Sequence, residues 1–187
     1  MFRIIVMLLL ILCIQTRTLA AIVIGNPHGK VTMIAVIDYQ CPYCKQDYPV
    51  IRKLIHNDPD LKVRLMPVAI INQISIYETA AAITATRYNK FHKLSQIFMA
   101  QAHLNAKGVN RILKQLELSS NKFNRLMHSK FVKQQMLEGL QFLKVESSGT
   151  PLFIIYPTHN PKLSTTLSGY QDYLKLRQVI RHAGSKL

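Results

Sequence analysis

Residues 31–45, VTMIAVIDYQCPYCK, decide the fold of this chain. The first seven are almost wholly apolar and rich in β-branched side chains, which is typical of a short strand buried on both faces of a sheet. Two cysteines follow, Cys41 and Cys44, and Pro42 stands where the first turn of a helix tolerates proline. The stretch therefore predicts a buried strand that delivers Cys41 to the start of a helix.

The helix after Cys41 is predicted over residues 42–56, because apolar side chains recur there at helical spacing. Its apolar residues are Tyr48, Ile51, Leu54 and Ile55. Pro49 falls inside this helix and is expected to kink it. The run Asn57-Asp58-Pro59-Asp60 is expected to end it.

The remaining elements complete an α/β pattern. Strands are predicted over residues 62–70, 152–156 and 162–167, and a closing amphipathic helix is predicted from Gly169. Residues 75–145 have periodic apolar positions and good helix formers, which indicates several helices with breaks near 105–108 and 118–121. Without this block the order is βαβ followed by ββα, which resembles the thioredoxin core. We therefore expect an α/β protein with the thioredoxin fold and a helical insertion subdomain at about 75–145.

Residues 1–20 have the pattern of a secretory signal: a positive start, an apolar run over residues 4–14 and small residues before the expected cut near Ala20. Residues 21–187 would then form the mature domain. An uncleaved membrane anchor is the alternative, although the run is shorter than the roughly 20 apolar residues that span a bilayer. A lipid anchor on Cys13 is disfavoured, since Leu12 precedes it where a small residue is usual.

The chain is strongly basic, with 24 Lys and Arg against 9 Asp and Glu and a net charge of +15. The cations are spread rather than clustered, and aromatic residues do not interleave with them, which indicates a solvated basic surface. Attraction to an anionic membrane surface or to acidic client proteins stays open. We expect no nucleic-acid partner, because no recognition motif is present.

The close cysteine pair points to redox chemistry or metal binding. Exported proteins usually use cysteines in distant structural bridges, and removal of Cys13 with the signal leaves only Cys41 and Cys44. At a helix N-terminus, unpaired backbone N–H groups and the helix dipole favour the thiolate, so the pKa of Cys41 should fall below its free value of about 8.5. The Cys41 thiolate is then the nucleophile of disulfide exchange, and Cys44, one turn later, closes the bridge. Pro42 and Tyr43 lie between the two cysteines and tune the stability of the Cys41 thiolate.

Metal binding is the competing interpretation of the pair. A structural zinc needs four ligands, and the chain has neither a second CxxC nor paired histidines. Cu(I) suits a bare CxxC better than zinc does. A further alternative is a chaperone that holds client proteins at the cysteine pair without disulfide turnover. Four methionines suggest copper but are spread along the chain and are more typical of core packing: Met66, Met99, Met127 and Met136. We expect no cofactor and no metal.

Residues 38–45, DYQCPYCK, together with Gly149-Thr150-Pro151, resemble the DsbA-like family of exported thioredoxin-fold oxidoreductases. The resemblance implies that Cys41 and Cys44 form a redox-active disulfide and that the Thr150–Pro151 bond is cis and lies beside it. Thr150 and Pro151 would offer backbone groups to a client strand. It further implies a periplasmic protein that exchanges disulfides with exported proteins and is recycled by a membrane redox partner.

The sequence constrains the direction of disulfide exchange and the oligomeric state less strongly. An oxidant is favoured, while isomerase and reductase relatives share the same motifs. Isomerases of this type pair through an extra N-terminal segment, and residues 21–31 leave no room for one, which favours a monomer.

One position departs from the family. Members often carry a buried acid six residues before the first cysteine, which helps move the proton of the second cysteine, and here that position is Ala35. Strand alternation directs the nearby Asp38 to the other face. The hypothesis from sequence is that Cys44 lacks a close proton acceptor.

Overall fold

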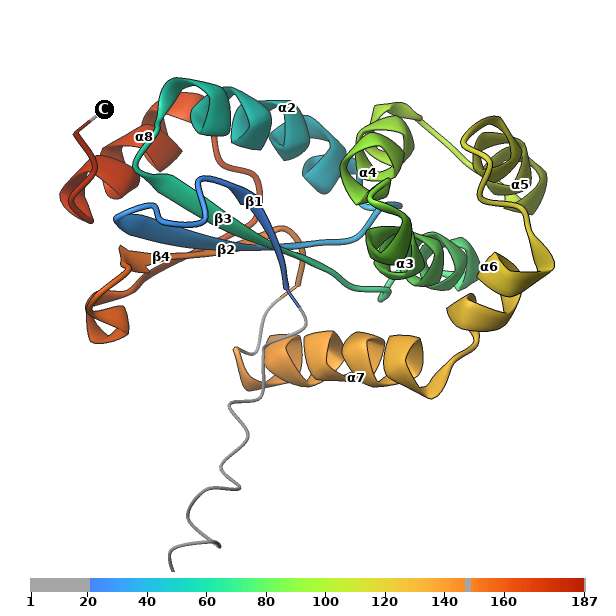
Figure 1. Ribbon diagram of the computed structural model, residues 1–187. Helices are drawn as coiled ribbons and strands as arrows, with labels where there is room; N and C mark the ends of the chain where they lie inside the picture. Colours follow the sequence, from blue (N-terminus) through green and yellow to red (C-terminus); the bar gives the residue numbers. More distant parts are fainter. Residues whose placement is uncertain (1–20, 147–148, 187) are drawn as a thin grey trace, which may run out of the picture.

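A five-stranded sheet in the order β1-β3-β2-β4-β5 forms the centre of the computed structural model, which describes residues 21–146 and 149–186 (Figure 1). Its strands are β1 (Ile22–Gly25), β2 (Val31–Ile37), β3 (Leu61–Pro67), β4 (Leu152–Pro157) and β5 (Thr165–Ser168). The central strand β2 is parallel to β3 and antiparallel to β4. All seven residues of β2 are buried, as its sequence predicts. The expected signal over residues 1–20 lies outside the described residues.

Seven α-helices and two short 3-10 turns make up the other elements of the described chain. The helices are α2 (Pro42–Asn57), α3 (Gln73–Ala85), α4 (Phe91–Ala100), α5 (Ala106–Gln115), α6 (Asn121–Met127), α7 (Lys130–Val145) and α8 (Tyr173–His182). The 3-10 turns are Thr86–Tyr88 and Pro161–Leu163. The predicted helical block between residues 75 and 145 therefore corresponds to α3–α7, and the thioredoxin fold with a helical insertion is confirmed.

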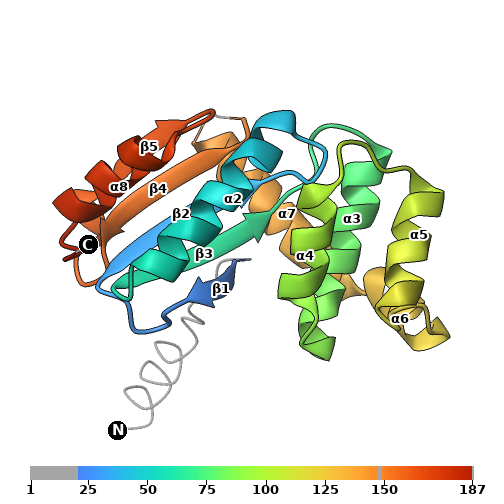
Figure 2. The same cartoon turned by 90° about the horizontal axis from the view of Figure 1, so that it is seen from above.

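The helices cover both faces of the sheet. Helices α2 and α8 lie on one face and α7 on the other, while α3–α6 stand beyond one end of the strands (Figures 1 and 2). Side chains of β2 alternate accordingly: Met33, Ala35 and Ile37 join the core beneath α2, and Ile34 and Val36 join the core beneath α7. The start of α2 is therefore placed at the junction between the sheet and the helical block.

Three details near the ends of the chain differ from the sequence prediction. The four-residue strand β1 was not predicted. The strand expected over 162–167 is instead a 3-10 turn that starts at Pro161, followed by β5 from Thr165. The last helix begins at Tyr173 rather than at Gly169, because Asp172 caps it through the Lys175 N–H and Gly169 has a φ of +78°.

The three residues before Cys41 each hydrogen-bond to the helical block. Asp38 accepts a hydrogen bond of 2.8 Å from the Ser75 hydroxyl, and the Tyr39 hydroxyl lies 2.7 Å from that of Ser95. The Gln40 amide donates to Glu78 at 2.7 Å. These bonds fix the segment between β2 and α2 against α3 and α4, so the helical block helps to position Cys41.

Asp38 is the central residue of this junction. It is fully buried, and its carboxylate also accepts from the backbone N–H groups of Gln40, Ile70 and Ile71, at 2.8, 2.8 and 3.2 Å. A buried carboxylate is stable only when such donors replace its water. The side chain is therefore committed to a structural role.

We predict that Asp38→Asn lowers the free energy of unfolding by about 2 to 4 kcal/mol, because the new amide cannot accept the bonds that one carboxylate oxygen accepts. Asp60→Asn is the control, since Asp60 forms a surface ion pair with Lys30 at 3.1 Å, of a kind worth less than about 1 kcal/mol. Urea denaturation measures both. Equal losses in the two variants would contradict the role of Asp38.

Candidate active site

The sulfur of Cys41 is the N-cap of α2. The N–H of Cys44, the third residue of the helix, donates to Cys41 Sγ at 3.4 Å, and the Cys41 backbone is extended, with φ −73° and ψ 119°. Helix N-caps are usually oxygen-bearing side chains that satisfy one of the free N–H groups of the first turn. Here a sulfur takes that place, so the first turn stabilises negative charge on the thiol.

The two thiols have opposite acidities. A hydrogen bond from the Cys44 thiol is the main reason that the pKa of Cys41 falls to about 6, opposed by burial and supported by the backbone N–H groups of Cys44 and Tyr43. Burial raises the pKa of Cys44 well above that of a free thiol, and the hydrogen bond to Cys41 adds to the effect. Cys44 is fully buried and Cys41 is 4% exposed. At neutral pH the pair thus carries one thiolate, on Cys41.

The Thr150–Pro151 peptide bond is cis, as the resemblance to the DsbA-like family implies. It lies beside the pair, since the Cys41 thiol can donate to the Thr150 carbonyl at 3.4 Å. The Pro151 carbonyl accepts from the Gly169 N–H at 2.9 Å, which links the loop to the end of β5. The structure therefore brings together residues that are more than a hundred positions apart in the sequence.

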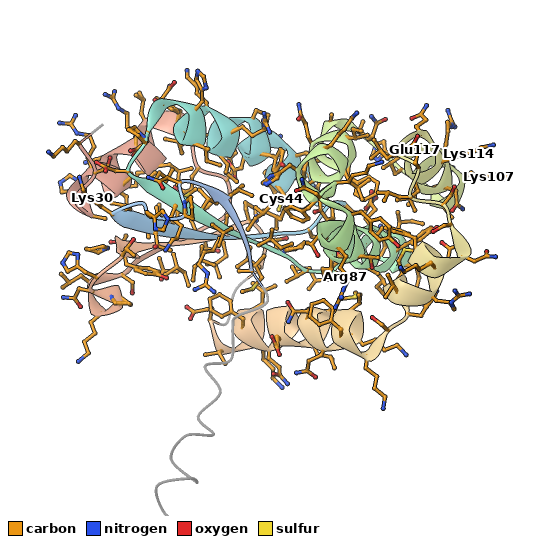
Figure 3. All side chains as sticks on the ribbon, viewed as in Figure 1. Lys30, Cys44, Arg87, Lys107, Lys114 and Glu117 are labelled. Atoms are coloured by element: carbon orange, nitrogen blue, oxygen red, sulfur yellow. The ribbon has the colours of Figure 1, made fainter. Side chains whose placement is uncertain are left out.

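Pro42 and Tyr43 form the first turn of α2, between the two sulfurs. Tyr43 is 57% exposed, and its backbone N–H helps to stabilise the Cys41 thiolate. Figure 3 places Cys44 at this end of α2, next to the helical block. The exposed ring of Tyr43 is available for contact with another molecule.

Two buried carboxyl groups near the pair were missed in the sequence analysis. Burial raises the pKa of Asp47, on α2, to about 7, and burial also raises that of Glu78, on α3, to about 7. Both side chains are fully buried. The signal for Asp47 is its spacing of three from Cys44, because it places a lone acid beside the apolar stripe of α2.

The metal-binding alternative concerns how possible ligand side chains are grouped in the described residues. These residues contain no group of three or more His, Cys, Asp or Glu side chains that could hold an ion. Of the four methionines that suggest copper, Met66, Met99 and Met127 are buried in the core and Met136 packs against it. In residues 21–146 and 149–186, no helix is long and apolar enough to cross a membrane.

The basic residues of the helical block face solvent. Lys107 and Lys114, for example, extend outward from α5 (Figure 3). Within the described part of the block, Lys90 forms an ion pair with Glu117 at 3.2 Å, and no other cation there is paired with a carboxylate. The interpretation as a solvated basic surface agrees with this arrangement.

We predict that Cys44→Ala raises the pKa of Cys41 by about 1 to 2 pH units, the equivalent of one hydrogen bond to a charged group. Cys44→Ser keeps a donor at this position and should raise it less. The ultraviolet absorbance of the thiolate, followed against pH, measures both values. An unchanged pKa in Cys44→Ala would show that the Cys44 thiol does not stabilise the Cys41 thiolate.

The family described as Thioredoxin matches residues 17–173 of the chain. Among solved structures, a thioredoxin-like oxidoreductase from Silicibacter pomeroyi has a TM-score of 0.80 at 24% identity, over 88% of this chain and 92% of its own. The catalytic domain of Proteus mirabilis ScsC has a TM-score of 0.76 at 21% identity, over 90% and 91%. The thiol-disulfide exchange protein alpha-DsbA2 from Wolbachia pipientis has a TM-score of 0.76 at 18% identity, over 88% of each chain.

A curated relative is similar over part of its length. The Na(+)/H(+) antiporter NhaA 3 of Salinispora tropica is 23% identical over 135 residues, which are 70% of this chain and 21% of the antiporter. The chain thus spans about a fifth of that protein. The solved structures show the fold, in line with the resemblance to DsbA-like proteins, and the family match covers most of the sequence. On this evidence the chain belongs to the thioredoxin family.

Proposed function

We propose that this protein is an exported thiol–disulfide oxidoreductase that works as an oxidant of client thiols. Cys41 is the residue that clients attack, and Cys44 is its partner in the redox disulfide. Membership of the thioredoxin family supports exchange chemistry in general. The direction rests on the acidity of Cys41.

The position of Cys41 Sγ as the N-cap of α2, which accounts in part for a pKa of about 6, is the observation that carries the proposal. A stabilised thiolate favours the reduced form of the pair, and a pair with a favoured reduced form readily gives its disulfide to others. The N–H groups at the start of α2 exist in the oxidised protein too, but there Cys41 has no charge for them to stabilise. The helix therefore stabilises the reduced form of the pair relative to the Cys41–Cys44 disulfide.

The cycle follows from the positions of the two sulfurs. A client thiolate attacks Cys41 Sγ, the Cys41–Cys44 bond breaks, and its electron pair passes to Cys44. A second client thiolate then attacks the client sulfur of the mixed disulfide and releases Cys41 as a thiolate. The client leaves with a disulfide, and the enzyme has gained two electrons, which a membrane redox partner removes.

Thr150 and Pro151 form the client-binding edge in this proposal. The Thr150 carbonyl lies 3.4 Å from Cys41 Sγ, so a client strand that pairs with this loop would bring its cysteine to the reacting sulfur. Pro42 and Tyr43 tune the thiolate through the backbone of the first turn, and the exposed ring of Tyr43 adds apolar contact.

The location proposed is the periplasm, after cleavage near Ala20, with the protein acting as a monomer on exported proteins. The periplasm is oxidising, so the disulfides that an exported oxidant gives to its clients persist there. The exposed basic side chains of α5–α7 favour clients with acidic segments.

The direct test mixes the oxidised protein, in a Cys13→Ser background, with a reduced, unfolded client that has two cysteines. We expect the client to form its disulfide while the protein becomes reduced in equal amount, as read by alkylation and mass spectrometry. Cys41→Ser should abolish the transfer.

Cys44→Ser tests the assignment of the two roles. With an oxidised client, this variant should accumulate a mixed disulfide on Cys41, because no second thiol is left to resolve it, and Cys41→Ser should accumulate none. Net reduction of client disulfides by the parent protein would instead identify a reductase. Stoichiometric Cu(I) binding without any client turnover would favour the metal-binding alternative.

A further inference from the structure

Asp47 is a buried carboxyl group one helical turn beyond Cys44. Its exposed fraction is 0%, and residues three apart on a helix have Cβ atoms about 5 to 6 Å apart. Its Oδ1 accepts a hydrogen bond of 3.1 Å from the Gln171 N–H. Its Oδ2 is buried and has no hydrogen-bond partner within the described residues. One oxygen is thus anchored, and the other is free to take or give a proton.

Gln171, whose N–H donates to Asp47, belongs to the loop between β5 and α8, next to the cis-proline loop. Gln171 follows Gly169, whose N–H donates to the Pro151 carbonyl at 2.9 Å. Thr150, in turn, contacts Cys41 through its carbonyl. Asp47 is therefore enclosed between α2 and the segment that supports the cis-proline loop, on the same side as the cysteine pair.

Few charges act on Asp47. The charged group that shifts the pKa of Asp47 is Cys41. The other titratable groups of α2 are Tyr43, Cys44, Lys45, Tyr48, Arg52, Lys53 and His56, and those from residue 170 to the end of α8 are Tyr170, Asp172, Tyr173, Lys175, Arg177, Arg181 and His182. Asp47 forms no ion pair with any cation of the described chain. Burial raises its pKa to about 7, the Gln171 hydrogen bond opposes this, and the negative charge of Cys41 adds to it.

Glu78 is a buried carboxyl group of similar acidity but different surroundings. Its Oε2 accepts from the Gln40 amide, and the charges that shift its pKa are those of Lys45 and Asp38 rather than Cys41. Electrostatic coupling to Cys41 therefore distinguishes Asp47 from Glu78. This makes Glu78 a matched control.

We propose that Asp47 exchanges the proton of Cys44 during each disulfide transfer, an inference that rests on the function proposed above. When a client thiolate attacks Cys41 and the Cys41–Cys44 bond breaks, the electron pair goes to Cys44 Sγ, and the Asp47 carboxyl supplies the proton that makes it a thiol. When a disulfide-bearing partner recycles the pair, Cys41 forms a mixed disulfide with it. The Asp47 carboxylate then takes the Cys44 proton, and the Cys44 thiolate attacks Cys41 Sγ and expels the partner thiolate.

The charge on Cys41 controls at which step Asp47 ionises. In the reduced protein the Cys41 thiolate adds to the effect of burial and raises the pKa of Asp47 further, which favours its protonated form. Once Cys41 is held in a mixed disulfide its charge is gone, and Asp47 ionises more readily. The base thus becomes available at the step that needs it, which compensates for the apolar Ala35.

The test separates the two steps of oxidation with oxidised glutathione as the probe. Full-length protein in a Cys13→Ser background is reduced, mixed with oxidised glutathione across a pH series, quenched in acid and alkylated. Mass spectrometry then follows the glutathione adduct on Cys41 and its conversion to the Cys41–Cys44 disulfide. In the parent protein the conversion should accelerate as pH rises through the ionisation of Asp47.

Asp47→Asn keeps an acceptor for the Gln171 N–H but cannot carry the proton. We expect it to slow the conversion step at neutral pH on the order of 100-fold, as for loss of a positioned proton-transfer group, and to remove the rise with pH. Adduct formation on Cys41 should change little. Glu78→Gln should retain the pH profile of the conversion, and Asp47→Glu should restore part of the rate.

The outcomes distinguish this inference from the function it rests on. A parent protein that forms no Cys41–Cys44 bridge overturns the proposed function as well. A parent that forms it normally, with the same rate and pH profile in Asp47→Asn, overturns the role of Asp47 alone. If Asp47→Asn does not fold, the Asp47→Glu variant and the parent profile decide, and a conversion rate that rises only at strongly alkaline pH would overturn the inference.

Discussion

The hydrogen bonds that Cys44 donates to the sulfur of Cys41, from its thiol and from its backbone N–H, are the interactions on which this site depends. The backbone bond makes a thiol the cap of a helix, so the polarity of the whole first turn acts on one ionisable atom. The same turn sends Cys44 into the core, where burial keeps its proton in place. A single helix start thereby produces two thiols of opposite character, one poised to carry charge and one poised to hold a proton.

The rest of the fold holds that helix start in position. Strand β2 is buried on both faces, and the three residues after it are hydrogen-bonded to α3 and α4, so the helical block supports the site as well as adding bulk. On the other side, β4 begins at the cis-proline loop and pairs with β2, which brings Thr150 to Cys41. The two buried aspartates differ in hydrogen bonding: the Asp38 carboxylate accepts from four donors, whereas Oδ2 of Asp47 has no hydrogen-bond partner within the described residues.

Sequence patterns predicted the elements with strong periodicity and the residues of the motif. The apolar run of β2, the helix after Cys41, the helical block and the cis bond before Pro151 follow from local patterns or from the family resemblance. The short strand β1 could not be predicted, since four residues carry no clear periodicity. The start of α8 depends on which of two nearby residues caps it, and Asp172 rather than Gly169 does so. Asp47 was missed because its burial depends on the β5–α8 loop, which no local pattern places against α2.

The central claim is that stabilisation of the Cys41 thiolate makes the pair an oxidant, and a glutathione redox titration tests it most directly. The protein is equilibrated over a range of glutathione ratios, alkylated, and the fraction of Cys41–Cys44 disulfide is read by mass. The account predicts a two-electron transition near the potential of DsbA, about −120 mV. A transition near that of thioredoxin, about −270 mV, or no bridge at any ratio, would contradict it.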